Sequence, residues 1–337
     1  MADRLEPLAA SLSSAAPVPP RSTNSVPGGG TVEQPLSPLT CGEFLAKEFP
    51  PREMLLAPIL PQKSISMLFG PRGLGKTFMA MGIALAVASG GTFLGWTAPV
   101  PAKVLYIDGE MPASLMQDRV AKAVRHLDRP DLAKANLFIL SADEIGRSLP
   151  DLGSEAGRKL YAPLLEQVDL IIIDNLSTLC RTGKENEAEG WDEIQAWVLV
   201  QRIAGRSVLF IHHAGKGGEQ RGTSKREDIM DTVIKLSRPL DYGQSQGARF
   251  RVEFSKARGI FGKDVEPFEA TLKDDQWTTS APVNDREEEI AALHDQGLSV
   301  RKIAKQTGMS ATSVHRMLTA LQLKAGEGEQ SAQGAML

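Results

Sequence analysis

Residues 64–77 read SISMLFGPRGLGKT, an apolar strand that runs into a glycine-rich turn and the start of a helix. From Gly70 to Thr77 the segment matches the phosphate-binding pattern G-x-x-x-x-G-K-[ST], in the strand–loop–helix context that the pattern requires. Its glycines allow a tight loop whose backbone N–H groups point inward at phosphate oxygens, and the following helix adds the positive end of its dipole. The sequence therefore predicts a site for the phosphates of a nucleotide.

Two side chains of this loop have predicted roles of their own. Lys76 is expected to neutralise the β- and γ-phosphates, and the Thr77 hydroxyl is expected to hold Mg²⁺. Asp174 ends the apolar run LIIID and is the second predicted Mg²⁺ ligand, directly or through water. ATP and Mg²⁺ are thus the expected cofactors. The predicted nucleotide-binding residues are Gly70, Pro71, Arg72, Gly73, Leu74, Gly75, Lys76, Thr77 and Phe78.

Hydrolysis also needs a group that activates water. Two acids directly follow a predicted strand in the segment VLYIDGEMP at 104–112. Glu110 is the predicted general base, at the mouth of the sheet and facing the γ-phosphate. Asp108 is the alternative.

Strands and helices alternate along the middle of the chain, which predicts an α/β domain with a mostly parallel sheet. Runs such as LIIID and VLFI are continuously apolar, as expected for strands buried on both faces. A hairpin is predicted after them, from strands at 249–256 and 266–272. The other expected strands are 64–69, 104–108, 137–140, 170–174, 207–212 and 231–236, and the expected helices are 77–89, 113–127, 155–167 and 191–204.

Composition limits the class of protein. The 337 residues suggest about two domains. The 38 Lys+Arg against 41 Asp+Glu exclude a uniformly basic nucleic-acid coat but leave room for a local basic patch. Cys41 and Cys180 are too few for a disulfide framework or a four-ligand zinc site. With no signal-peptide pattern and no long apolar stretch, we expect a soluble cytoplasmic protein without membrane contact.

The predicted domain organisation follows the changes in composition. Residues 1–38 are rich in Ala, Ser, Pro and Gly, and we expect a disordered tail there. An ATPase domain is predicted over 39–277, and its first part, 39–61, is expected to pack on the main domain. A linker at 278–284, a helical module at 285–324 and a disordered tail at 325–337 complete the prediction.

The chain resembles RecA-like hexameric ATPases of the RepA/DnaB branch, and especially RepA-type plasmid replicative helicases. The resemblance implies a RecA-like fold, a homo-oligomeric ring that is a hexamer, and single-stranded DNA in its channel. It also implies that Glu110 is the catalytic base and that His213, or its neighbour His212, senses the γ-phosphate. The matching pieces are GPRGLGKT at 70–77, YIDGEMP at 106–112, LIIIDNLSTL at 170–179, FIHHAGKG at 210–217, RGTS at 221–224 and FSKARG at 254–259.

Lys256 and Arg258 are predicted to lie on one face of a strand end, because side chains two residues apart in a strand point the same way. By the resemblance they reach the γ-phosphate bound by the next subunit. The helicases have an arginine ten residues after the Arg of RGxS, but Asp231 occupies that position here. Arg226 is the alternative arginine finger.

Two loops correspond to those that grip single-stranded DNA in RecA-like rings. The loop at 180–189 is more acidic than basic, which argues against a strong DNA contact. The loop at 215–226 is rich in glycine and cations, so it can follow a phosphate backbone. Its predicted DNA contacts are Lys216, Arg221, Lys225 and Arg226.

The segment GLSVRKIAKQTGMSATSVHRML at 297–318 reads as two short helices joined by a Gly-x-Ser turn, a helix-turn-helix pattern. It resembles the DNA-binding ends of serine recombinases. From 297 to 324 there are five Lys or Arg residues and no acid, so one basic face is expected on an otherwise acidic protein. The residues predicted to face the major groove of duplex DNA are Thr312, Ser313, His315 and Arg316.

Three functions remain open from the sequence. The first is a Mg-ATP-dependent ring ATPase that acts as a RepA-like replicative helicase of a plasmid or mobile element. The second is a DNA-binding regulator or recombination mediator without helicase activity, which the helix-turn-helix favours. The third is a signalling ATPase with protein partners only.

Overall fold

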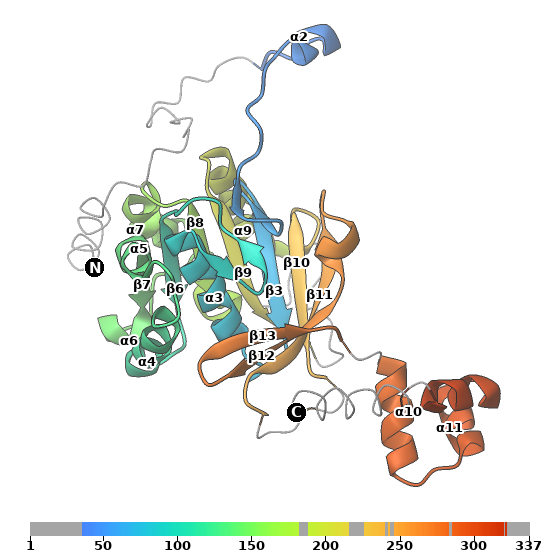
Figure 1. Cartoon of the computed structure of the whole chain (residues 1–337). Helices are drawn as coiled ribbons and strands as arrows, with labels where there is room; N and C mark the ends of the chain where they lie inside the picture. Colours follow the sequence, from blue (N-terminus) through green and yellow to red (C-terminus); the bar gives the residue numbers. More distant parts are fainter. Residues whose placement is uncertain are drawn as a thin grey trace.

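The computed structural model describes residues 36–181, 188–215, 226–239, 242, 246–282, 285–319 and 321. Its centre is a nine-stranded sheet in the order β13-β12-β11-β10-β3-β9-β8-β6-β7 (Figure 1). Six neighbouring strands are parallel: β3 (Ile65–Gly70), β6 (Val104–Asp108), β7 (Leu137–Ser141), β8 (Leu170–Asp174), β9 (Ser207–His213) and β10 (Thr232–Ser237). The predicted α/β class with a mostly parallel sheet is confirmed.

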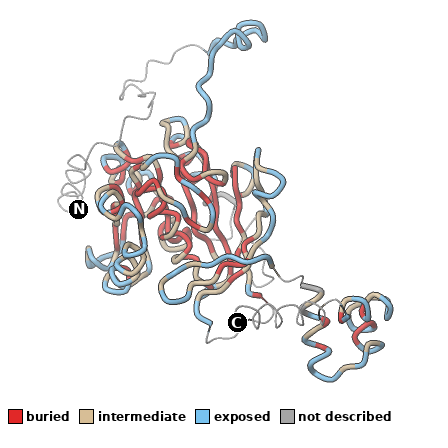
Figure 2. Tube along the Cα trace, in the orientation of Figure 1, coloured by how far each residue is buried: buried red, intermediate tan, exposed pale blue. Residues whose placement is uncertain are grey.

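Helices cover both faces of this sheet, whose strands are largely buried (Figure 2). Each face has its own apolar cluster. One face carries α3 (Lys76–Ser89), α4 (Ala113–Val124) and α5 (Pro130–Asn136). The other carries α7 (Glu155–Leu165), α8 (Leu176–Leu179) and α9 (Ala188–Ile203). Successive side chains of a strand point to opposite faces, so Leu68 joins the first cluster while Met67 and Phe69 join the second.

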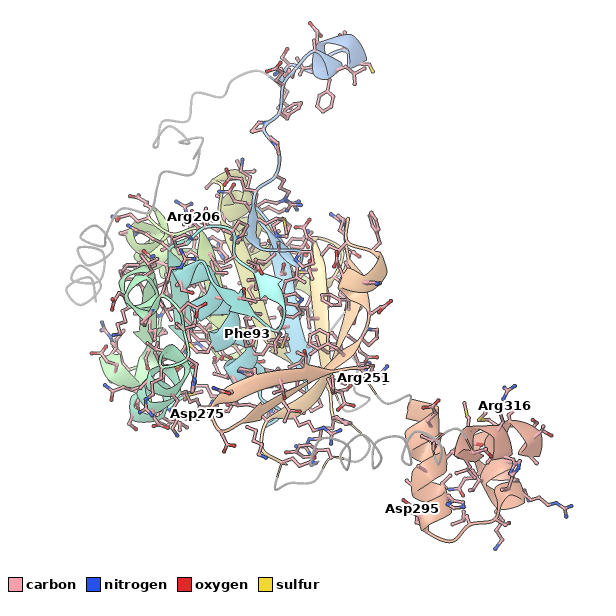
Figure 3. The ribbon with its side chains drawn as sticks, viewed as in Figure 1. Phe93, Arg206, Arg251, Asp275, Asp295 and Arg316 are labelled. Atoms are coloured by element: carbon pink, nitrogen blue, oxygen red, sulfur yellow. The ribbon has the colours of Figure 1, made fainter. Side chains whose placement is uncertain are left out.

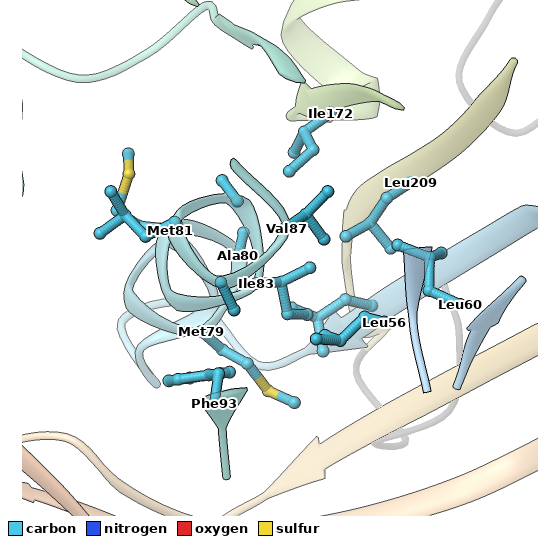
Figure 4. Close-up of a cluster of buried hydrophobic side chains, with 14 of the residues drawn as sticks. Leu56, Leu60, Met79, Ala80, Met81, Ile83, Val87, Phe93, Ile172 and Leu209 are labelled. Carbon is cyan, nitrogen blue, oxygen red and sulfur yellow. The ribbon is translucent and has the colours of Figure 1, made fainter. Parts of the chain in front are cut away.

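Helix α3 is buried almost all round, and this fixes the start of the helix against the sheet. Figure 4 shows its side chains, among them Met79 and Ile83, packed against Leu56 and Leu209. Removing that much apolar surface from water stabilises the helix far more than intrinsic propensity does. The residues at the N-terminus of α3 are therefore held in a fixed position relative to the strand ends.

The predicted packing of 39–61 is right in its second half only. Strands β1 (Met54–Leu56) and β2 (Leu60–Pro61) bury Leu55 and Leu60 in the core. Helix α2 (Cys41–Leu45) buries no residue and lies away from the sheet in Figure 1. Its apolar side chain Phe44 contacts Phe49, with ring centroids 5.3 Å apart, and both remain exposed.

The C-terminal edge of the sheet is longer than predicted. Strands β11 (Arg249–Ala257) and β12 (Phe268–Lys273) form the expected antiparallel pair, and the short helix η4 (Gly262–Val265) lies between them. A third strand, β13 (Gln276–Ser280), pairs with β12, so the predicted linker at 278–284 is wrong in its first residues. Asp274 and Asp275 make the tight turn between β12 and β13, both with left-handed φ angles.

The small helical module predicted at the C-terminus is confirmed. It contains α10 (Asp285–Asp295), α11 (Val300–Thr307) and a helical stretch at 311–319. Its own apolar cluster lies apart from those of the sheet and contains Ile290, Leu293, Ile303, Ala304, Val314 and Leu318. Within the described parts of the chain, no helix is long and apolar enough to cross a membrane.

The remaining short elements border the core. They are β4 (Thr92–Phe93), β5 (Trp96–Thr97) and α6 (Ala142–Ile145). Strands β4 and β5 form a small hairpin beside α3.

Candidate active site

The parallel strands have their carboxyl ends side by side, and a cavity of about 950 Å³ opens there. Strand β3 leads into the glycine-rich loop, and β6, β8 and β9 end near it. Ligands of open parallel sheets bind at the carboxyl ends of the strands. The cavity brings together the predicted residues Lys76, Thr77, Glu110, Asp174 and His213.

The glycine-rich loop has the backbone that its sequence predicts. Gly73 and Gly75 have left-handed φ angles of 70° and 114°. At Gly75 a Cβ atom would also lie 3.1 Å from the Phe250 ring, so the close packing of β11 requires glycine there. Leu74 is buried in the core, which leaves only its backbone to face phosphate.

Lys76 is folded into the loop that it belongs to. Its Nζ donates hydrogen bonds to the carbonyl oxygens of Gly70, at 3.0 Å, and Pro71, at 2.7 Å. The residue is 6% exposed, and burial lowers the pKa of Lys76 to about 8. The ammonium group therefore lies inside the loop, where the phosphates are expected to bind.

This pKa sets an expected pH dependence of nucleotide binding. Phosphate binds the charged form of Lys76, so above pH 8 binding has to include proton uptake, whereas below pH 8 the group is already charged. We expect affinity for metal-free ADP to fall about tenfold between pH 7 and pH 9. Isothermal titration calorimetry in buffers of different ionisation enthalpy measures both the affinity and the proton uptake. Lys76→Met is the control, and a wild-type profile as flat as that variant's contradicts the assignment.

The predicted magnesium ligands are in direct contact. Thr77 Oγ1 donates to Asp174 Oδ2 at 2.8 Å, and the Tyr106 hydroxyl donates to the same oxygen at 2.7 Å. Burial raises the pKa of Asp174, and these two hydrogen bonds oppose that shift. A hydroxyl and a carboxylate beside a phosphate loop are the oxygen donors that Mg²⁺ takes in nucleotide sites. The residues present fit the ion.

Glu110 and Asp108 differ in their exposure to the cavity. The side chain of Glu110 is 62% exposed, its Oε2 accepts a hydrogen bond from the Asn175 side-chain amide, and it lies 4.0 Å from His213 Nε2. Asp108 is buried and accepts from the backbone N–H of Met111 at 3.0 Å. Burial, and then the charge of Asp174, raise the pKa of Asp108 to about 6. The geometry favours Glu110 as the group that can reach a water molecule.

The two adjacent histidines point to different surroundings. His213 lines the cavity, whereas His212 is fully buried, with its Nε2 3.0 Å from Arg226 Nη1. Of the two candidates, His213 is the one placed beside the nucleotide site.

Arg226 is not placed for either of its predicted roles. It is 6% exposed, contacts His212 and lies over the Trp191 ring, 5.8 Å from the centroid. A guanidinium enclosed in its own subunit reaches neither a DNA backbone nor a neighbouring active site. The other predicted contacts of that loop, Lys216, Arg221 and Lys225, lie outside the described residues.

Lys256 and Arg258 lie toward the amino ends of the parallel strands, whereas the phosphate loop lies at their carboxyl ends. Lys256 pairs with Val233 near the start of β10, and β10 runs parallel to β3. Both side chains turn to the backbone carbonyl of Asp228, at 3.2 Å from Lys256 Nζ and 3.3 Å from Arg258 Nη2, so they share a face as predicted. Neither side chain is among the described residues that line the nucleotide cavity of its own chain.

Asp231 explains one departure from the helicase pattern. It is buried, and its Oδ2 accepts from the backbone N–H of Ile65 at 3.0 Å. Two cations, Arg202 at 3.3 Å and Arg52 at 3.5 Å, neutralise its charge. The position therefore carries an ion cluster that ties the start of β3 to the start of β10, and has no arginine finger.

The helical module presents one polar face. Ser310 caps the helical stretch at 311–319 by accepting from the backbone N–H of Ser313 at 3.1 Å, and the Ser313 hydroxyl lies 2.9 Å from that of Ser310. Thr312, His315 and Arg316 are exposed (Figure 3 labels Arg316). Three of the four predicted base-reading side chains are thus open to a ligand, and Ser313 is partly engaged in the cap.

Three residues of the site escaped the sequence reasoning: Asn175, Tyr106 and Arg119. Asn175 directly follows the predicted metal ligand, and Tyr106 lies two residues before Asp108, on the same face of the strand. Both positions carried a usable signal. Arg119 had none, because only folding places its guanidinium over the Phe78 ring, 4.2 Å from the centroid.

Models of two domain families match parts of the chain. The C-terminal residues 292–322 match the IclR helix-turn-helix domain, so that match replaces the predicted likeness to serine recombinases. The fold is similar to that of a KaiC-like protein from the hyperthermophilic archaeon Pyrococcus horikoshii, at 16% identity and a TM-score of 0.47, over 67% of this chain and 93% of that chain. Residues 32–219 match the AAA domain model. This stretch of the chain contains the glycine-rich loop, Glu110, Asp174 and His213. Because that match covers more than half of the 337 residues, the chain belongs to the AAA domain family of ATPases.

Proposed function

We propose that the protein is a Mg-ATP-dependent ring ATPase that acts on DNA. The observation that carries the proposal is that the proposed catalytic groups lie at opposite ends of the parallel strands. The nucleotide cavity, at the carboxyl ends of the strands, is lined by Lys76, Thr77, Asp174 and Glu110. Arg258 lies toward the amino ends of the strands. Each active site is completed by the next subunit, which favours a closed ring, and we take that ring to be a hexamer.

In this mechanism the chain's own residues hold the phosphates and remove one proton. Lys76 and the loop N–H groups neutralise and orient the β- and γ-phosphates. Glu110 accepts a proton from the attacking water. His213, 4.0 Å from Glu110, is proposed to respond to the charge of Glu110 and to the γ-phosphate. Thr77 and Asp174 would hold Mg²⁺, which would supply further charge neutralisation of the phosphates.

DNA is the proposed partner at two places. The helix-turn-helix module exposes Thr312, His315 and Arg316, and its match to the IclR domain supports duplex binding. The loop at 215–226 is proposed to hold single-stranded DNA in the ring channel, on the strength of its sequence alone. We favour a replicative helicase of a plasmid or mobile element.

A second function, a duplex-binding regulator without helicase activity, is favoured by the helix-turn-helix itself. ATP hydrolysis measured without DNA, with single strands and with duplex separates the two. We expect the strongest stimulation by single strands. Stimulation by duplex alone makes the protein a regulator, and indifference to both favours a signalling ATPase with protein partners.

The duplex contact gives a quantitative prediction. Arg316→Ala is expected to lower duplex affinity by about 1–3 kcal/mol at one base position, because an arginine that reads a base edge discriminates between bases. Arg301→Ala on α11 is the matched control, expected to weaken all sequences alike and to reduce the salt slope by about one. Binding titrations over salt, on duplexes varied one base pair at a time, measure both. Equal losses on every duplex for Arg316→Ala contradict base reading.

A further inference from the structure

A second cavity, of about 340 Å³, lies beside the nucleotide cavity between α3, α4 and the β12–β13 hairpin. The two cavities share a wall that includes Phe78, Arg119 and Asp275. Figure 3 labels Phe93 and Asp275, which line the second cavity. Its volume lies within the range of about 300–1,000 Å³ that is typical of small-molecule sites.

The floor of this cavity is aromatic and already in place. Gly82 of α3 has no side chain, and a Cβ there would overlap the Phe93 ring, so the ring lies directly on the helix. Trp277 packs edge-on against Phe93, with ring centroids 5.6 Å apart. Rings fixed by close packing need little rearrangement to bind a flat ligand, and this lowers the entropic cost of binding.

Two cationic side chains, one histidine and one acid lie at the rim of the cavity. Arg119, Lys122 and His126 line it, with Asp275 as the acidic member. Arg119 lies over the Phe78 ring, and Lys122 is paired with Asp118 on the exposed side of α4, at 2.8 Å. Both Arg119 and Lys122 also line the nucleotide cavity, so an anion held by them lies at the wall that the two cavities share.

We propose that this cavity is a binding site for a flat aromatic acid, with the ring on Phe93 and Trp277 and the acid group at Arg119 and Lys122. The site is distinct from the nucleotide site but coupled to it. Phe78 directly follows Thr77, and both Phe78 and Arg119 line both cavities, so filling one changes the wall of the other. By linkage, the ligand and the nucleotide change each other's affinity by the same factor.

The probe for the test is 8-anilinonaphthalene-1-sulfonate, an aromatic acid whose fluorescence rises in apolar surroundings. We expect the full-length protein to bind one equivalent saturably, with energy transfer from tryptophan. Its uncharged analogue, N-phenyl-1-naphthylamine, is expected to bind about tenfold more weakly because the acid group is missing. Probe titrations with and without saturating ADP measure the coupling, and an unchanged probe affinity contradicts it.

Two variants test the place of binding. Ala123 lines the cavity, so Ala123→Phe fills it and is expected to weaken probe binding by at least about tenfold. Ala162→Phe on α7, in another surface hollow, is the matched control and is expected to leave binding unchanged. If Ala123→Phe shows no cooperative thermal unfolding, Lys122→Gln decides, with an expected weakening of about threefold or more. Wild-type probe affinity in the folded cavity variant, non-saturable binding, or equal affinity for the two probes overturns the proposal.

Discussion

Glu110→Gln is expected to bind ATP like the wild type and to hydrolyse it about 10²- to 10⁴-fold more slowly. Glutamine keeps the length of the side chain and can still accept the hydrogen bond from Asn175, but it cannot take a proton from water. Steady-state ATPase assays give the rate, and equilibrium binding of a fluorescent ATP analogue gives the affinity. Lys76→Ala is expected to differ, because it loses the cation that neutralises the phosphates and so loses binding as well.

Two further variants make this result specific. Glu144→Gln changes an exposed acid of α6 outside the nucleotide cavity and is expected to hydrolyse ATP at the wild-type rate. Asp108→Asn tests the alternative base. If Asp108→Asn abolishes turnover while Glu110→Gln keeps it, the base is Asp108, and the exposed position of Glu110 at the cavity has another purpose.

The predicted site residues that line the cavity share one physical origin. Asp174 and His213 each end a buried apolar strand, and parallel strands end at the same edge of a sheet. A polar residue at the end of such a strand is therefore placed near the phosphate loop by topology alone. Close to these strand ends, Ile173 and Phe210 are register partners, although they lie far apart along the chain.

The sequence predicted less well wherever the outcome depended on partners from elsewhere in the chain. Phe44 belongs to an apolar segment that suggested packing, yet α2 remains exposed. Strand β13 is short and polar, and it forms only because the turn at Asp274 and Asp275 returns the chain to β12. Arg226 lies in a basic run that suggested a surface loop, but the folded chain encloses it beside His212 and Trp191.

In the proposed ring, the two ends of the parallel strands have different roles. The phosphate loop requires the carboxyl ends of the parallel strands. The antiparallel strand β11 runs back toward the amino ends of the parallel strands. Lys256 therefore lies there, as does Arg258 just after the strand. A monomer therefore has a nucleotide site without these cations and a pair of cations without a nucleotide.

Arg258→Ala is expected to reduce ATP hydrolysis about 10³- to 10⁵-fold, the range found for arginines that stabilise charge in phosphoryl transfer. Lys263→Ala, an exposed cation in η4 of the same hairpin, is the matched control and is expected to retain activity. The distance of Arg258 from the nucleotide cavity of its own chain predicts one more result. Arg258→Ala mixed with Glu110→Gln should recover part of the wild-type rate, although each variant alone is inactive.

Recovery is expected because some interfaces of the mixed ring pair an intact Glu110 from one subunit with an intact Arg258 from its neighbour. Placing both substitutions in one chain and mixing it with wild type provides the comparison, since that mixture has the same number of altered residues in a different arrangement. Subunit exchange has to be shown separately, by energy transfer between labelled subunits. If exchange occurs and activity does not return, Arg258 acts within its own subunit or only in folding, and the division of the active site between subunits is wrong.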